Sequence, residues 1–180
     1  MKVSFELSPR DIKYFRERLQ RVRGGERSRD EETVIRLARN LVEEAAASEP
    51  PEFVRERLTT LGRLADMLVD AQWRLEGRDR ARILDALAYF VDPDDMISDR
   101  TPGLGYLDDA IMIELISQEL KHDIKAYEDF SAIRGKRSKG IDADKLETAR
   151  ESLLSRMRRR RHRDRESRRQ QSNGPRFRLW

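Results

Sequence analysis

The chain has 180 residues, with 38 Lys and Arg, 34 Asp and Glu, no cysteine and a formal net charge of +4. The lack of cysteine excludes disulfides, thiolate metal ligands and a cysteine nucleophile, and it favours a reducing compartment. Hydrophobic residues make up 37% and charged residues 40% of the chain, which suits amphipathic helices better than buried strands. We therefore expect an all-α protein with one core.

Targeting signals are not apparent in the sequence. The N-terminal segment MKVSFELSPRD has neither the apolar run nor the small-residue cleavage site of a secretory signal. The longest apolar stretches, residues 81–91 and 110–116, contain charged residues and are far shorter than the roughly 20 apolar residues that a membrane span requires. We expect a cytoplasmic protein with no transmembrane span.

Two amphipathic helices are predicted in the first 50 residues. Ser8 and Pro9 provide a hydroxyl cap and a proline at the first helical position, and apolar residues at helical spacing continue to about residue 23. Asp30 is the expected N-cap of a second helix, which ends before Pro50. Each of these helices should bury one face.

Two more helices are predicted before residue 92. The third extends from about Glu52 to about Glu76, and Gly77 closes it. The fourth begins at Asp79 and is apolar nearly all round up to Val91. We expect this fourth helix to be the most buried one.

An ordered loop is predicted at residues 92–105, where DPDDMISDRTPGLG contains two prolines and two glycines. A single long helix should follow from Tyr106 to Phe130. No strand-like alternation of useful length occurs in the sequence. The predicted fold is therefore an irregular helical bundle of about five to six helices.

Charge divides the predicted domains. Residues 155–180 contain 11 Arg but only Asp164 and Glu166 as acids, a net charge of +9, which leaves −5 for residues 1–154. We expect a helical bundle at residues 1–133, a basic linker at 134–140, a C-terminal helix at 141–162 and an Arg-rich flexible tail at 163–180. Like-charge repulsion is the reason to expect flexibility in the tail.

The segment ALAYFVDPDDMISDRTPGLGYLDDAIMIEL lies within the signature region, residues 86–130. It resembles the YkvA family, also known as domain of unknown function 1232. The residues that carry the resemblance are Tyr89, Pro93, Asp95, Ile97, Asp99, Pro102, Gly105, Leu107, Asp108 and Asp109. The resemblance implies a helix–loop–helix over about residues 79–130, and it implies no particular reaction.

The sequence departs from the family pattern at three positions. Ser98 stands where the family commonly has a second proline, and Arg100 and Thr101 stand where apolar residues usually follow the aspartate. Many relatives are hydrophobic enough to suggest membrane association. These departures argue against such an association here.

Aspartates at the two ends of the loop are candidate metal ligands. Hard cations such as Mg²⁺ or Ca²⁺ need several converging carboxylate oxygens, and the candidates are Asp95, Asp99, Asp108 and Asp109. In the alternative interpretation, these carboxylates cap helices and pair with nearby arginines. A metal site here would allow a metal-dependent hydrolase.

Familiar catalytic arrangements are missing from the sequence. His122 and Asp123 are neighbours on a predicted helix and do not face each other. With two histidines, no cysteine and no glycine-rich phosphate loop, nucleophilic and nucleotide-binding motifs are absent. The aromatic residues around the signature have the spacing of core residues rather than of a base-stacking platform. The sequence leaves enzymatic activity open and leans toward a nonenzymatic protein.

The arginine block is the leading candidate binding site. Guanidinium groups suit phosphate oxygens, and binding through them is salt-dependent and largely sequence-independent. The predicted partner is an acidic macromolecule, RNA or another nucleic acid. Anionic lipid is a weaker candidate, because the block lacks the apolar face needed at a lipid surface. The candidate residues are Arg156, Arg158, Arg159, Arg160, Arg161, Arg163, Arg165, Arg168 and Arg169. The alternative is a solvated extension that keeps the protein soluble.

The C-terminus offers a second candidate site. Phe177, Leu179 and Trp180 place apolar anchors at the end of the charged segment, which suits docking into a groove of a protein partner. The leading interpretation is thus a nonenzymatic binding module whose arginines engage an acidic partner. A protein-interaction adaptor and a metal-dependent hydrolase remain as alternatives.

Overall fold

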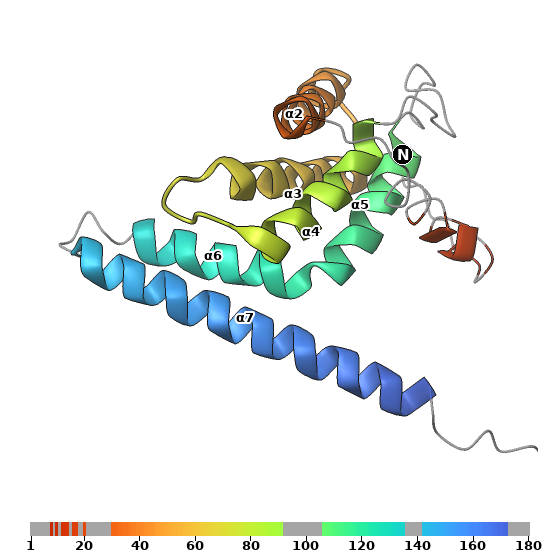
Figure 1. The fold of residues 1–180 in the computed structure, drawn as a ribbon. Helices are drawn as coiled ribbons and strands as arrows, with labels where there is room; N and C mark the ends of the chain where they lie inside the picture. The colour runs from red at the N-terminus through yellow and green to blue at the C-terminus, as the bar shows by residue number, and fades with distance from the viewer. Residues whose placement is uncertain are drawn as a thin grey trace, which may run out of the picture. The chain divides into compact units, whose positions relative to one another are not determined.

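The computed structural model describes residues 8, 10, 12–14, 16–17, 20, 30–91, 106–135 and 142–172. All regular elements over these residues are helices, which confirms the all-α fold class (Figure 1). The described residues of the first predicted helix, from Arg10 to Gln20, are helical. The predicted loop at 92–105 and residues 136–140 of the predicted linker lie outside the described residues. The chain divides into two compact units, residues 1–119 and 120–180.

The first unit is arranged around one helix. It contains α2 (Glu31–Ala47), α3 (Glu52–Val69), α4 (Gly77–Leu87), the 3-10 helix η1 (Ala88–Val91) and α5 (Leu107–Glu119). Helix α3 contacts α2, α4 and α5, and its apolar side chains, such as Leu61 and Leu64, are fully buried. The predicted cap of α2 is confirmed, since Asp30 Oδ2 accepts a hydrogen bond of 3.1 Å from the Thr33 amide.

Aromatic residues near the signature fill this core, as the sequence predicts. Trp73 is fully buried, and Tyr89 and Tyr106 are 6% and 7% exposed. The Tyr89 and Phe90 rings pack edge to face, with their centroids 5.1 Å apart. These rings therefore serve packing, and they do not form an exposed stacking surface.

Helix α3 is shorter than predicted. It ends at Val69, because Asp70 Oδ1 accepts hydrogen bonds from the backbone amides of Gln72 at 2.9 Å and Trp73 at 3.0 Å. This side-chain turn offers the backbone an alternative to the helix and directs Trp73 into the core. Gly77, predicted to close the helix, instead begins α4 with a φ of +53°.

The most buried helix of this unit is α5, not the predicted α4. Residues 108–113 of α5 are all buried, and so is Ile116. Helix α4 is amphipathic, with Arg78, Ala81 and Asp85 exposed. The prediction underrated the exposed positions of this helix because the apolar residues around them are closely spaced.

The predicted long helix from Tyr106 to Phe130 is two helices. Helix α5 ends at Glu119 and α6 (Lys121–Gly135) begins two residues later. The carbonyl oxygen of Leu120 accepts hydrogen bonds of 2.9 Å from the amides of both Asp123 and Ile124. This break involves no proline or glycine, so composition gives no signal for it.

The second unit is a helical hairpin in which α6 lies beside α7 (Ala143–Ser172), as Figure 1 shows. The predicted boundary at residue 162 is wrong, since α7 continues through the arginine block to Ser172. Arginine is a good helix former, and His162 Nδ1 lies 3.3 Å from Glu166 Oε2, one turn further along the helix. Residues 163–172 of the predicted flexible tail are therefore helical. Among the described helices, none combines the length and the apolar character of a membrane span.

Candidate functional site

The candidate site is the surface of α7, which is held in place by its opposite face. Leu146, Leu153, Leu154 and Met157 of α7 are buried, and their spacing places them on one side of the helix. Ile124, Tyr127 and Phe130 of α6 are buried as well. Because α6 has 15 residues and α7 has 30, α6 covers only part of α7.

A buried ion pair joins the two helices. Arg161 Nη1 lies 2.9 Å from Asp123 Oδ1, and the two side chains are 13% and 1% exposed. Such a pair, removed from water, is costly to break from one side only, because the remaining charge stays buried. Arg161, predicted from sequence to bind phosphate, is therefore engaged within the hairpin.

A second cluster joins the helices one turn further along α7. Asp164 Oδ2 lies 2.7 Å from Lys121 Nζ and 2.9 Å from His122 Nε2. Hydrogen bonds from Lys121 and then from His122 lower the pKa of Asp164 from its ordinary 3.8 to about 2. The carboxylate is thus ionised over the physiological pH range.

The outward surface of α7 carries two rows of exposed arginines. Arg156, Arg159 and Arg163 are exposed, and steps of three and four residues place them along one line, which we call row A. Arg158, Arg165 and Arg169 are also exposed, and steps of seven and four define row B. With 3.6 residues per turn, the two rows lie about 130° apart around the helix axis.

Neither acidic residue of the block lies in a row. Asp164 faces α6 through its pairs with Lys121 and His122. Glu166 pairs with His162 at 3.3 Å, and helical geometry places both between the rows on the solvent side. Between residues 156 and 169, rows A and B therefore contain no acid.

The structure separates the nine predicted arginines into two groups. Arg160 and Arg161 are half-buried, and the others are exposed. Arg168 belongs to neither row. It lies on the side of α7 that faces α6 at earlier residues such as Arg161, but it follows Asp164, which pairs with Lys121 at the start of α6, and it is exposed. The predicted docking residues Phe177, Leu179 and Trp180 lie outside the described residues.

The predicted metal site is described only at one end. Asp108 and Asp109 are buried in the first turn of α5, where carboxylates interact favourably with the helix dipole. Asp95 and Asp99 fall outside the described residues. Within the described ranges, no three His, Asp or Glu side chains gather as metal ligands do.

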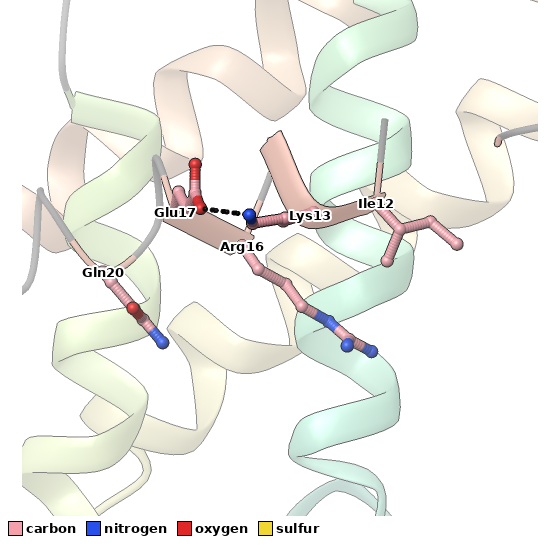
Figure 2. Close-up of a pocket in the computed structure, with 5 residues that line it drawn as sticks. All are labelled: Ile12, Lys13, Arg16, Glu17 and Gln20. Carbon is pink, nitrogen blue, oxygen red and sulfur yellow. Dashed lines mark ion pairs between the residues drawn. The ribbon is translucent and has the colours of Figure 1, made fainter. Parts of the chain in front are cut away.

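A hollow of about 500 Å³ lies along the first helical segment, lined by Ile12, Lys13, Arg16, Glu17 and Gln20 (Figure 2). Lys13 Nζ and Glu17 Oε1 are 3.6 Å apart, and both side chains are largely exposed. The lining comes from one segment of chain, and two of its three charged residues, Lys13 and Glu17, pair with each other. We assign no ligand to it.

Sequence reasoning missed the anchoring residues of the site. Lys121, His122 and Asp123 begin α6, and their partners on α7 are 38 to 43 residues away. The sequence did contain one signal, because two acids, Asp164 and Glu166, interrupt the arginine block. Asp164 holds the block against α6.

The signature region of the sequence matches a known family model. Residues 79–115 match the family model described as "Protein of unknown function (DUF1232)", so the resemblance to that family is confirmed. Comparison with curated proteins yields no match. Comparison with solved structures yields none either. The chain thus carries a DUF1232 segment at residues 79–115, and this segment includes most of α4, all of η1 and the first part of α5.

Proposed function

We propose that the protein is a nonenzymatic module that binds nucleic acid through the exposed arginines of α7. The observation that supports this function is the pair of arginine rows on one helix, with the two acids of the arginine block, Asp164 and Glu166, placed outside both rows. Guanidinium groups form strong, charge-assisted hydrogen bonds to phosphate oxygens. A surface of this kind binds any phosphate backbone, RNA or DNA, with little dependence on base sequence.

The hairpin contributes pre-organisation. A flexible basic tail must be ordered when it binds, which opposes association. In α7 the arginines already lie on a helix whose other face is fixed by Arg161–Asp123 and by the Asp164 cluster. We place this activity in the cytoplasm, in keeping with a cysteine-free sequence.

The test is a binding titration of the full-length protein. Fluorescence anisotropy with labelled 20-nucleotide RNA and 20-base-pair DNA is measured at several salt concentrations. We expect binding whose logarithmic affinity falls linearly with the logarithm of salt concentration. The triple variant Arg156→Gln, Arg159→Gln, Arg163→Gln should bind more weakly, and its salt slope should be smaller by about 2 to 3, because up to three phosphate contacts are lost.

A matched control distinguishes the loss of these particular arginines from the loss of net positive charge. Arg10, Arg36 and Arg78 are exposed arginines of the first unit, and changing all three to Gln removes the same net charge. This control should retain the affinity of the unaltered protein. Loss of equal size in both triple variants, or no binding to any of the probes, contradicts the proposed function.

A protein-interaction adaptor that uses Phe177, Leu179 and Trp180 makes a different prediction. Truncation after Ser172 would leave nucleic-acid binding intact and remove a protein partner. The arginine rows favour nucleic acid as the first function to test, since their exposed charge is positive on both flanks of the helix.

A further inference from the structure

We infer that the preferred ligand of α7 is double-stranded DNA of B form, bound with the helix in the major groove. This inference rests on the proposed function and specifies its ligand. It is carried by the placement of rows A and B on opposite flanks of the solvent-facing side of one helix.

Two rows about 130° apart cannot both lie against one narrow chain of phosphates, since each row points to a different side. A groove presents phosphates on both of its walls. The major groove of B-form DNA, about 12 Å wide, admits an α-helix. Row A then faces one wall and row B the other, and every exposed arginine of the two rows finds a phosphate.

The hairpin leaves the required face open. The residues directed toward α6 are Leu153, Leu154, Met157 and Arg161, all with low exposure. By helical geometry, the direction midway between the rows on the solvent side lies nearly opposite this buried face. Helix α6 therefore stands behind α7 and does not obstruct entry into a groove.

The floor between the rows also suits a groove. His162 and Glu166 lie there, paired with each other, and in the bound arrangement they face base edges rather than phosphates. A carboxylate in either row would repel phosphate, whereas a carboxylate between the rows avoids it. The second acid, Asp164, is turned toward α6.

This surface is poorly suited to binding single-stranded nucleic acid. Sequence-independent binding of single strands relies on aromatic side chains on which bases stack. In the described part of residues 120–172, Tyr127 and Phe130 are buried, and the exposed ring, His162, is paired with Glu166. Duplex RNA is a second poor fit, because its major groove is deep and narrow.

The test compares three probes of one sequence with the full-length protein: a 20-base-pair DNA duplex, its single strand, and the corresponding RNA duplex. We expect the DNA duplex to bind roughly ten-fold more tightly than either of the others at moderate salt. Equal or tighter binding of the single strand or of the RNA duplex overturns the inference while leaving the proposed function intact. Failure of all three probes to bind overturns both.

Charge-matched variants test the two-row geometry itself. One triple removes row A, with Arg156, Arg159 and Arg163 changed to Gln. A second removes row B, with Arg158, Arg165 and Arg169 changed to Gln. A mixed triple removes one arginine of each row together with Arg168, as R156Q/R165Q/R168Q, so all three variants have the same net charge.

Loss of either complete row should reduce the preference for DNA duplex over single strand to about two-fold or less, because only one wall of the groove is then contacted. The mixed triple keeps two arginines in each row and should retain most of the preference. Equal preference in all three variants shows that only total charge matters and contradicts the inference. Far-ultraviolet circular dichroism of each variant checks that helix content is unchanged.

Discussion

Arg161 of α7 and Asp123 of α6 form a buried ion pair whose polarity is opposite to that of the adjacent cluster. In the pair, α6 supplies the acid and α7 the base, at 2.9 Å. In the cluster, α6 supplies Lys121 and His122, and α7 supplies the acid, Asp164. A change of register between the helices would bring like charges together, so this arrangement specifies one alignment of the hairpin.

Replacing Arg161 by Met should destabilise the hairpin by roughly 3 kcal/mol, because the Asp123 carboxylate then remains buried without its main counter-charge. Urea denaturation followed by circular dichroism measures the loss. The double variant Arg161→Met, Asp123→Leu should recover most of the stability, since it buries no unbalanced charge. A single variant as stable as the original protein would show that the pair contributes little.

Acid should weaken the hairpin through Asp164. Its pKa in the folded protein is about 2, below its ordinary 3.8, because Lys121 and His122 donate hydrogen bonds to the carboxylate. A depressed pKa stabilises the folded state fully above the unfolded value, and that contribution is lost as the pH falls from about 4 to about 2. The Asp164→Asn variant should therefore have a lower melting temperature than the original protein near neutral pH, and the difference should shrink toward pH 2.

The control for this measurement is Glu166→Gln, which removes one carboxylate from the solvent side of the same helix. If both variants lower the melting temperature by the same amount at neutral pH, the contacts of Asp164 with α6 are not the cause of the destabilisation. A difference that persists unchanged down to about pH 2 would argue against the same assignment.

The sequence predicted those parts of the fold that depend on local patterns. Capping chemistry predicts Asp30 as the N-cap of α2, and Pro50 predicts that this helix ends before it. Helical spacing predicts the buried aromatic residues. The end of α3 at Val69 and the break at Leu120 were missed. The first depends on Asp70, whose side chain accepts hydrogen bonds from backbone amides two and three residues further on. The second has no helix-breaking residue to signal it.

The sequence predicted which arginines make up the candidate site but not that they lie on a helix. The arginine block was identified from its charge, and self-repulsion suggested a flexible tail. The structure forms a helix through Ser172 instead. Pairing with α6 stabilises this helix as far as Asp164, and beyond that point arginine is itself a good helix former. Contacts such as Arg161–Asp123 join residues 38 positions apart, and no short-range pattern reveals them.

Arg80 is predicted to stabilise the first unit by joining three elements. Its Nη1 donates to the carbonyl oxygens of Leu68 at 2.7 Å and Leu75 at 3.3 Å, and its Nη2 pairs with Glu31 of α2. The Arg80→Met variant keeps an unbranched side chain and loses these bonds, at a cost of about 2 kcal/mol in the free energy of unfolding. The exposed Arg78 on the same helix is the matched control, and Arg78→Met should change stability by less than about 0.5 kcal/mol.

The N-cap of α2 provides a separate test of local structure. Asp30 Oδ2 accepts hydrogen bonds from the amide of Thr33 at 3.1 Å and from its hydroxyl at 3.2 Å. The Asp30→Ala variant should lose about 1 kcal/mol of stability, because amides in the first turn of α2 lose their acceptor. Asp30→Asn keeps the side-chain oxygen and should retain most of that stability, as measured by chemical denaturation. If the asparagine variant is as unstable as the alanine variant, the negative charge of Asp30 at the N-terminus of α2 contributes more than the hydrogen bond does.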